Sequence, residues 1–582
     1  MIQAQISEIF FSPTNLVRDE LSFANANVRE LRHWASQLSL LQLGDTTEAV
    51  FKALYEIAEL KCPETLRFDL IQTLHPLIEN VLSNLEKNFL NQGLFLSDRT
   101  RDIIELTTKL RTLFADIYID IVQRSEKQLQ QKKISIFNFS EKRNLKTARL
   151  LSSYYALEQL GLLLIQQQML YRSAFSKQWL MTHYLYDLAI KNQQHSLNIN
   201  QLQGTNYCLK NIHQMYAKVL LLEIFNTHQI RPSEIYALYQ CSSDWTQLIQ
   251  ISSTETPLSR YIIDTTKDHP PTYNRTLHES FKPNIFISTQ DLLEHINLTI
   301  QKDNEYLSKN EKAFLSAPLK FHVQNVLGST TERRHERYDY SAQLQICFSL
   351  LTAHFYLSKG RDFVDTLALD ELQTDISNNN AFNYNTSIAV DQSSKTLNKQ
   401  ARQIFSTQVL DISMNGYRVN WIAQDAPSHL RTGEFLLISE GENGKWKGGV
   451  IRWIKQTVQK NYELGLEVIG PNILPCAVKV ITEQTNFSYH PCLFILTPKL
   501  DAPEYSLILP NSPFFKEHKT VVLRLIEQDI KIQLVKAILI TQSFVQLSFE
   551  LLNKDQKNLL EQFIQQHNFE LHRHQNVWEN TK

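Results

Sequence analysis

The period of the hydrophobic pattern changes once along this chain, near Asn325, and this change most constrains what the chain can fold into. Before it, apolar residues recur at steps of three and four, as in the run Ile103, Leu106, Leu110, Leu113, Ile117 and Ile121. Such spacing places one apolar stripe along one face of a helix. After it, short β-branched runs alternate with a period of two, which is typical of half-buried antiparallel strands. The pattern therefore predicts a helical part followed by a β-rich part.

The helical part, residues 1–320, is predicted to be an all-α domain. Further helix-like stretches run from Leu150 to Leu164 and from Ile212 to Ile224, and Pro232 suits the first turn of another helix. No fixed repeat register can be assigned to these segments. We therefore expect stacked helical hairpins, arranged as a bundle or an irregular solenoid.

The β-rich part is predicted to contain strands at residues 343–348, 435–438, 450–454, 464–469 and 530–534. Residues 358–403 interrupt this pattern, because they are polar, Asn-rich and without a sustained period. A segment of this composition cannot bury enough apolar surface to fold. We therefore expect a mobile insertion at about 358–403 within a β-barrel domain of residues 321–472.

The overall composition excludes several classes of protein. Its 582 residues suggest about three or four domains, and 59 Lys+Arg against 60 Asp+Glu leave a net charge of -1, so no global field favours nucleic acid or a membrane. The N-terminus lacks the features of a signal peptide, and no apolar stretch is long enough to span a bilayer. The six cysteines are scattered without CxxC spacing, as expected of reduced thiols. These features predict a cytoplasmic protein.

Signatures of catalysis are missing from the sequence. The chain contains no GxxxxGK[ST] phosphate loop, no GxGxxG, no HExxH and no GxSxG. We therefore expect no enzyme activity, no catalytic residue, no metal and no cofactor.

Two short motifs in the β-rich part carry the chemistry. The first is Glu332-Arg333-Arg334-His335-Glu336-Arg337, directly before a predicted strand, and the second is Asp411-Ile412-Ser413-Met414-Asn415-Gly416, followed by strand residues 417–421. Either motif alone is commonly a solvated turn. Their order, together with the strands that follow, is a more demanding pattern, and we favour a ligand site.

This combination resembles the PilZ domain family, whose pattern is an RxxxR loop, a strand, a DxSxxG turn and a small antiparallel barrel. Arg333 and Arg337 match the loop, whereas Asp411, Ser413 and Gly416 match the turn. The resemblance covers roughly residues 325–470 and implies binding of the bacterial messenger cyclic di-GMP. The gap between the motifs is longer than is usual in the family, and an insertion there could cover the site.

The side chains suit that ligand. A planar guanidinium can fork onto guanine O6 and N7, stack on the base or pair with a phosphate. Arg334 is either a third phosphate contact or a solvated side chain. Asp411 can accept from the guanine N1 and N2 donors, and the Ser413 hydroxyl can donate or accept. Gly416 permits a positive φ and a close backbone approach beside the ligand.

Residues 473–570 are predicted to form a second β-barrel with a C-terminal helix. The order of strands and closing helix is similar to a degenerate PilZ barrel, but both binding motifs are missing from it. We expect this barrel to serve packing or partner binding.

Together these features predict a multidomain α+β protein that acts as a bacterial cyclic di-GMP receptor. Binding would be transmitted by domain rearrangement to a protein partner, through the helical domain. One alternative is a PilZ-fold scaffold that binds no ligand, and another is an enzyme with its active site among the helices. The output pathway, whether motility, pili, biofilm or secretion, is open at this stage.

Overall fold

The computed structural model describes residues 14–38, 42–90, 94, 96–131, 139–274, 281–301, 305–329, 337–367, 402–423, 427, 430–441, 444–481, 489–497, 503–525 and 527–566. The chain divides into two compact units, Met1–Thr331 and Glu332–Lys582. The division falls one residue before Arg333, the first arginine of the predicted binding loop.

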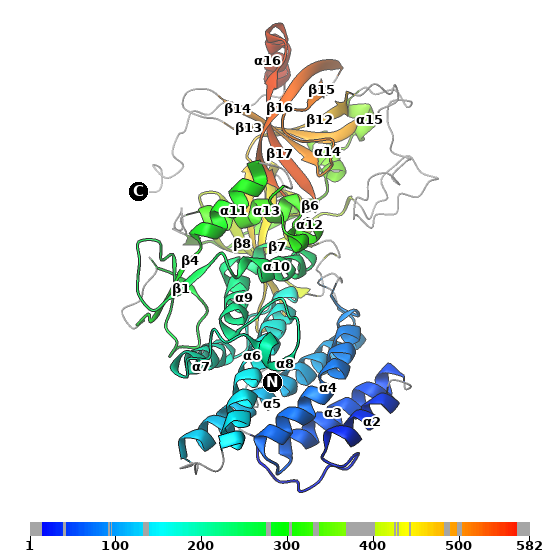
Figure 1. Cartoon of the computed structure of the whole chain (residues 1–582). Coiled ribbons are helices and arrows are strands. Elements are labelled where there is room, and N and C mark those ends of the chain that lie inside the picture. Colours follow the sequence, from blue (N-terminus) through cyan, green and yellow to red (C-terminus); the bar gives the residue numbers. More distant parts are fainter. Residues whose placement is uncertain are drawn as a thin grey trace. The chain divides into compact units, whose positions relative to one another are not determined.

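The first unit is mainly helical (Figure 1). Its described α-helices are α2 Val28–Leu38, α3 Leu43–Glu59, α4 Glu64–Glu86, α5 Asp98–Gln131, α6 Phe139–Met169, α7 Gln178–Lys191, α8 Ile199–Gln203, α9 Ile212–Ile224, α10 Pro232–Trp245, α11 Gln290–Gln301, α12 Lys309–Phe314 and α13 Ala317–Gly328. A 3₁₀ turn, η2, lies at Thr227–Gln229. The predicted helices at 103–121, 150–164, 212–224 and after residue 232 are confirmed as α5, α6, α9 and α10.

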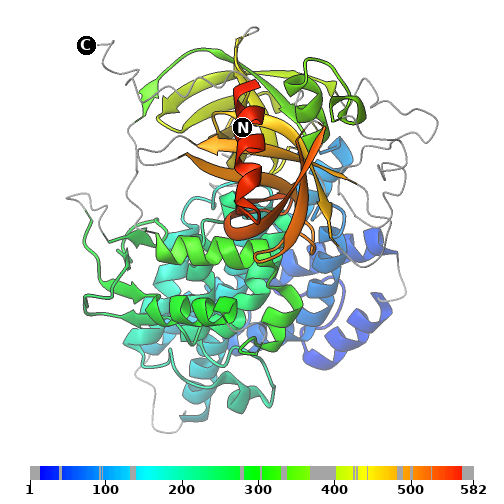
Figure 2. The same cartoon turned by 90° about the horizontal axis from the view of Figure 1, so that it is seen from above.

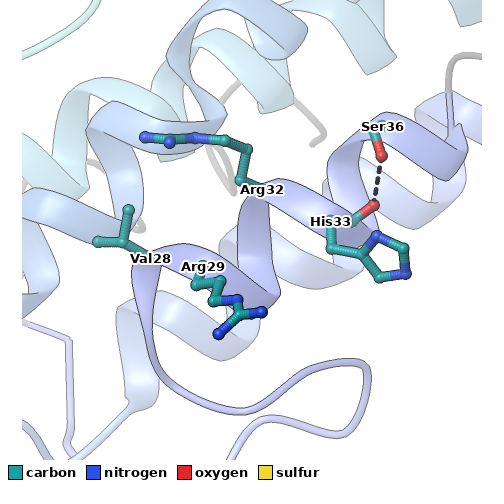
Figure 3. A pocket seen from close by; sticks show the side chains of 5 residues that line it. All are labelled: Val28, Arg29, Arg32, His33 and Ser36. Atoms are coloured by element: carbon teal, nitrogen blue, oxygen red, sulfur yellow. Dashed lines mark hydrogen bonds between the residues drawn. The ribbon is translucent and has the colours of Figure 1, made fainter.

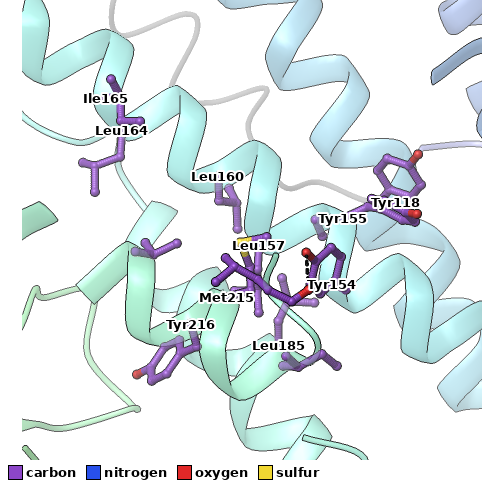
Figure 4. Packing of buried hydrophobic residues seen from close by; sticks show 14 of the residues in the cluster. Tyr118, Tyr154, Tyr155, Leu157, Leu160, Leu164, Ile165, Leu185, Met215 and Tyr216 are labelled. Carbon is purple, nitrogen blue, oxygen red and sulfur yellow. Dashed lines mark hydrogen bonds between the residues drawn. The ribbon is translucent and has the colours of Figure 1, made fainter. Parts of the chain in front are cut away.

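Local sequence and packing both explain the two longest of these helices. Ser97 caps α5, since its Oγ accepts a hydrogen bond from the backbone N–H of Thr100 at 3.2 Å. Helix α5 packs along α6, and α6 in turn packs against α9. Figure 4 shows the resulting core, in which Tyr118 of α5 lies near Tyr155 of α6, and Met215 of α9 lies among leucines of α6. One continuous apolar core therefore joins helices that are distant in sequence.

The expectation of an all-α first domain is wrong in one region. A four-stranded antiparallel sheet with the order β1-β4-β2-β3 lies between α10 and α11. Its strands are β1 Gln250–Ser252, β2 Tyr261–Ile263, β3 Thr272–Tyr273 and β4 Ile285–Ser288. Strands of two to four residues are too short for an alternating pattern to become visible in a sequence.

The second unit begins with a β-barrel. Its sheet has the strand order β5-β7-β6-β9-β10-β11-β8, and a further β7–β8 pairing closes it. The strands are β5 Tyr338–Asp339, β6 Gln343–Phe348, β7 Phe405–Ser413, β8 Gly416–Trp421, β9 Phe435–Glu440, β10 Lys447–Gln456 and β11 Tyr462–Gly470. All neighbouring strands are antiparallel, as predicted.

A closed six-stranded barrel follows, in the order β12-β13-β14-β17-β16-β15. Its elements are β12 Ile473–Val480, β13 His490–Thr497, β14 Glu504–Pro510, β15 Thr520–Leu525, β16 Gln528–Ile540, β17 Phe544–Leu551, η6 Lys554–Gln556 and α16 Lys557–Gln566. Figure 2 shows α16 in red against the orange strands of this barrel, and Leu560, Phe563 and Ile564 of α16 join the barrel core. The predicted second barrel with its closing helix is therefore confirmed.

The expectation of a mobile insertion at 358–403 is wrong for residues 358–367. After β6 the chain forms α14 Leu350–Leu357 and α15 Phe363–Thr366. Phe363 and Leu367 are buried against Ala477 and Tyr489 of the second barrel, and the Leu367 carbonyl accepts a hydrogen bond from Arg524 Nε at 3.2 Å. The first ten residues of the segment are thus packed, because their few apolar side chains meet a surface that is distant in sequence. Residues 368–401 lie outside the described residues.

His354 of α14 joins the two barrels from a fully buried position. Its Nε2–H donates to the Cys492 carbonyl of β13 at 2.7 Å. Burial, a stronger influence than this hydrogen bond, lowers the pKa of His354 from 6.5 to about 4. The folded protein therefore holds a neutral imidazole at a pH where the unfolded chain already takes up a proton.

We expect the second unit to lose stability as the pH falls from 6.5 to about 4, the window between the unfolded and folded pKa of His354. Above this window the contribution is fully present, and the total loss is roughly 3 kcal/mol. Hydrogen exchange in peptides of both barrels, corrected for the intrinsic exchange rates, measures this loss of stability. His354→Gln should flatten the slope of stability against pH. His183→Asn, at a buried histidine of the first unit, should leave it unchanged, and an unaltered slope in His354→Gln would contradict the assignment.

Candidate functional site

The structure describes four of the six predicted site residues. Arg333 and Arg334 lie outside the described residues. The other four lie on neighbouring strands of the first barrel: Arg337 directly before β5, Asp411 and Ser413 in β7, and Gly416 at the start of β8.

The pairing of β5 with β7 brings the two motifs together. Tyr338 pairs with Ile412, and Asp339 pairs with Asp411. Arg337 thereby reaches Asp411 across 74 positions of sequence, and its Nη1 donates to Asp411 Oδ1 at 3.1 Å. The Arg337 side chain keeps 40% of its surface exposed, whereas that of Asp411 keeps 11%. The carboxylate is thus enclosed while the guanidinium faces solvent.

A β-bulge lies directly beside Asp411. The β7–β8 register shifts between Val409, which pairs with Val419, and Asp411, which pairs with Arg418. Leu410 is therefore the extra residue. From Asp411 to the turn the register is regular, since Ser413 pairs with Gly416. The turn therefore places Asp411 opposite Arg418, and the bulge changes the register only on the far side of Asp411.

Arg418 is the site residue that the sequence analysis missed. Its Nη1 donates to Asp411 Oδ2 at 3.2 Å, and its Nη2 donates to Glu463 Oε2 of β11 at 2.8 Å. These contacts, led by the hydrogen bond to Glu463, raise the pKa of Arg418. A signal was present in the sequence, because a two-residue turn pairing Ser413 with Gly416 also pairs Asp411 with Arg418.

The turn itself is held by Ser413 and Gly416. The Ser413 hydroxyl donates a long hydrogen bond of 3.4 Å to the Gly416 carbonyl. The expectation of a positive φ at Gly416 is wrong, since Gly416 is not among the positive-φ glycines of the described chain. The close approach is instead to the Leu466 carbonyl of β11, which a Cβ at Gly416 would overlap. Glycine is needed here for strand packing.

Gly416→Ala is therefore expected to destabilise the first barrel by about 1–3 kcal/mol, because the backbone of β11 must move to make room. Denaturant unfolding, with hydrogen exchange at residues 405–421 and 462–470, measures the loss. Gly441→Ala provides the comparison, since a Cβ there meets nothing within 4 Å but the backbone has a φ of +71°, so it reports strain without a clash. No loss in Gly416→Ala would contradict the packing explanation.

One aromatic side chain extends the row of site residues across the sheet. Arg418 pairs with Gly465 of β11, and Gly465 pairs with Trp453 of β10. The Trp453 indole lies directly over Gly465, where a Cβ would overlap it. Gly465 therefore leaves space for a planar ring next to the Arg418 position, and such rings offer a stacking surface to a base.

Features elsewhere in the described residues do not compete with this site. A shallow hollow of about 460 Å³ on α2 is lined by Val28, Arg29, Arg32, His33 and Ser36, and Figure 3 shows the two arginine side chains extending in different directions from the helix. It contains none of the predicted site residues. Within the described ranges, no group of three or more His, Cys, Asp or Glu side chains could hold a metal ion, and no helix is long and apolar enough to cross a membrane.

Comparisons with protein families match nearly the whole chain. Residues 29–256 match the N-terminal domain of the cyclic-di-GMP receptor FimW, residues 260–401 and 373–475 match its middle PilZ domain, and residues 476–552 match its C-terminal β-barrel domain. The middle match includes both predicted motifs and also residues that lie in β2–β4 and α11–α13 of the first unit.

A curated relative has the same extent. The cyclic-di-GMP receptor FimW of Pseudomonas aeruginosa is 25% identical over 578 residues, which cover 91% of this chain and 92% of the relative. A solved structure of MrkH, described as a c-di-GMP dependence transcription regulatory factor, aligns with 28% of this chain and 80% of its own at 12% identity; its TM-score of 0.14 supports no argument. Models of the three FimW domains match in order along the chain, and the middle match identifies residues 260–475 as containing a PilZ domain.

Proposed function

We propose that this protein is a receptor for cyclic di-GMP and not an enzyme. The ligand is bound by two groups of residues, the arginines Arg333, Arg334 and Arg337 and the turn residues Asp411, Ser413 and Gly416. The observation that carries the proposal is the contact between Arg337 and Asp411, 74 positions apart, on one face of the first barrel. Similarity to FimW, whose name describes a cyclic-di-GMP receptor, supports the same ligand.

The chemistry of the site supports this ligand. Cyclic di-GMP presents two phosphates and two guanines, and the Arg337 guanidinium can fork onto a phosphate or onto guanine O6 and N7. Asp411 can accept hydrogen bonds from the guanine N1 and N2 groups, which adenine does not present in the same arrangement. The proposed division of roles gives affinity to the arginines and base selection to the turn.

Isothermal titration calorimetry tests the proposal on the full chain. Cyclic di-GMP should bind, while cyclic di-AMP and GTP at the same concentrations should bind at least about tenfold more weakly. Cyclic di-AMP lacks the guanine edge, and GTP offers one guanine and no second phosphodiester. Equal heats for all three nucleotides, or none for cyclic di-GMP, would contradict the receptor assignment.

We propose further that binding is transmitted to a protein partner by domain rearrangement. The division between the two units falls one residue before Arg333, so a ligand that holds this loop orders the connection itself. Coupling of this kind usually amounts to about 1–3 kcal/mol. Small-angle scattering with saturating cyclic di-GMP should show changed dimensions, and hydrogen exchange should show new protection at residues 328–338. Tight binding that leaves both unchanged would contradict the rearrangement.

A scaffold that binds no ligand is the second candidate, and one observation favours it. Both oxygens of Asp411 are already paired with arginines of the chain, so the ion-pair network is complete without a ligand. The same calorimetric titration separates the two.

The proposed cyclic di-GMP receptor would act in the cytoplasm and without nucleic acid.

A further inference from the structure

Asp411 is held by two arginines that differ in how they are themselves held. Arg337 binds Oδ1 from the segment that precedes β5, and Arg418 binds Oδ2 from the middle of β8. Arg418 is anchored a second time by Glu463. Among the described residues, Asp411 is the one carboxylate paired with Arg337. Within the described part of the chain, one arginine is therefore fixed to the barrel from two sides, and the other is held by Asp411.

This difference decides which ion pair can open. For Arg337 to reach an anionic ligand, it must leave Asp411 Oδ1 or share it. An enclosed carboxylate that lost its last cation would be strongly disfavoured. Because Arg418 stays bound to Oδ2, Asp411 remains compensated while its Oδ1 becomes free to accept new hydrogen bonds.

We infer that Arg418 is a positioning residue for ligand recognition. It holds Asp411 in place, so that Arg337 and Asp411 Oδ1 can both exchange their mutual ion pair for contacts with the ligand. The inference rests on the proposed binding of cyclic di-GMP. Arg418 acts through Asp411 and not on the phosphates. It therefore governs the choice of base more than the dependence of binding on salt.

The register of the barrel supports this role. Asp411 and Arg418 are directly opposite each other in the β7–β8 pair, a geometry in which side chains of opposite charge interact. Arg418 also faces Gly465 on its other side. Glu463 is two residues before Gly465 in β11, so its side chain lies on the same face and within reach of the Arg418 guanidinium.

A double-mutant cycle on cyclic di-GMP binding tests the inference in the full chain. Calorimetry is run on the wild type, Arg418→Ala, Asp411→Ala and the double variant. Arg418→Ala alone should weaken binding by about tenfold. In the Asp411→Ala background the same change should alter affinity by less than about twofold, because its target is gone. Selectivity against cyclic di-AMP should fall in Arg418→Ala, while the salt slope stays within about 0.3 of the wild type.

Two further variants separate positioning from a general loss of fold or charge. Arg452→Ala is the matched control: Arg452 pairs with Glu467 across β10 and β11 at a similar exposure of 39%, outside the Asp411 contacts, and should leave affinity unchanged. Arg418→Lys should recover only part of the loss, since an ammonium cannot fork between Asp411 and Glu463.

The outcomes are distinct. A wild type that binds cyclic di-GMP but shows equal losses for Arg418→Ala in both backgrounds would mean that Arg418 touches the ligand directly, and it would overturn the positioning role alone. Unchanged affinity and selectivity in Arg418→Ala would do the same. A wild type that does not bind would overturn the receptor assignment together with this inference.

Discussion

Replacing Arg337 by alanine is expected to weaken the binding of cyclic di-GMP by roughly 1.5–3 kcal/mol, or about ten- to a hundredfold. The variant loses a planar cation that can fork onto phosphate or guanine. Arg337 is the arginine of the first motif that the structure places against Asp411. Arg337→Lys should recover little, because a single ammonium lacks the fork. Calorimetry of the full chain at one fixed salt concentration measures the loss.

The same loss is expected for Arg333→Ala on the sequence evidence of the RxxxR motif. Combining it with Arg337→Ala should bring binding below detection at micromolar protein concentration. Arg452→Ala, which removes an exposed cation from the same sheet, should bind as the wild type does. If the double variant kept the wild-type affinity, the arginine loop would have no part in recognition.

Phe544→Ala is expected to lower the free energy of unfolding of the second unit by about 3–5 kcal/mol. Phe544 is fully buried at the start of β17. Its ring packs edge-to-face on Phe435 of the first barrel, with 5.7 Å between the ring centroids. Ser543 Oγ beside it donates to Glu434 at 2.7 Å. The substitution therefore opens a cavity between the barrels as well as at the end of one.

Because the contact joins the barrels, both should lose protection against hydrogen exchange in Phe544→Ala. Phe514→Ala gives the comparison within the same barrel, since Phe514 is 39% exposed and its removal should cost clearly less. Loss of protection restricted to residues 473–566 would show that the barrels unfold independently, against the expectation of one coupled unit.

The hydrophobic pattern was sufficient to predict those elements that bury one face. In β16, Ile530, Ile532 and Leu534 are buried and alternate with polar residues, so a period of two was visible. The type of element could be predicted from the sequence where an element faces the core on one side only.

Strands and helices that are covered on two sides were not readable in the same way. In β12, Cys476 and Val478 face the barrel core, while Ala477 between them packs with Phe363 and Leu367. Six successive residues of β12 are buried, so alternation disappears and no strand was predicted there. Helix α14 was missed for a related reason, since a mainly apolar segment of eight residues, interrupted only by Thr352 and His354, suits either a buried strand or a helix.

The sequence by itself determined the residue types of the site and the local turn, because Ser413 to Gly416 is a hairpin whose pairing follows from neighbouring residues. Only the tertiary structure decided that Arg337 meets Asp411 and that Glu463 anchors Arg418. These contacts depend on the register between strands distant in the chain. A shift of one residue would turn each side chain to the other face, and the packing of the whole barrel prevents such a shift.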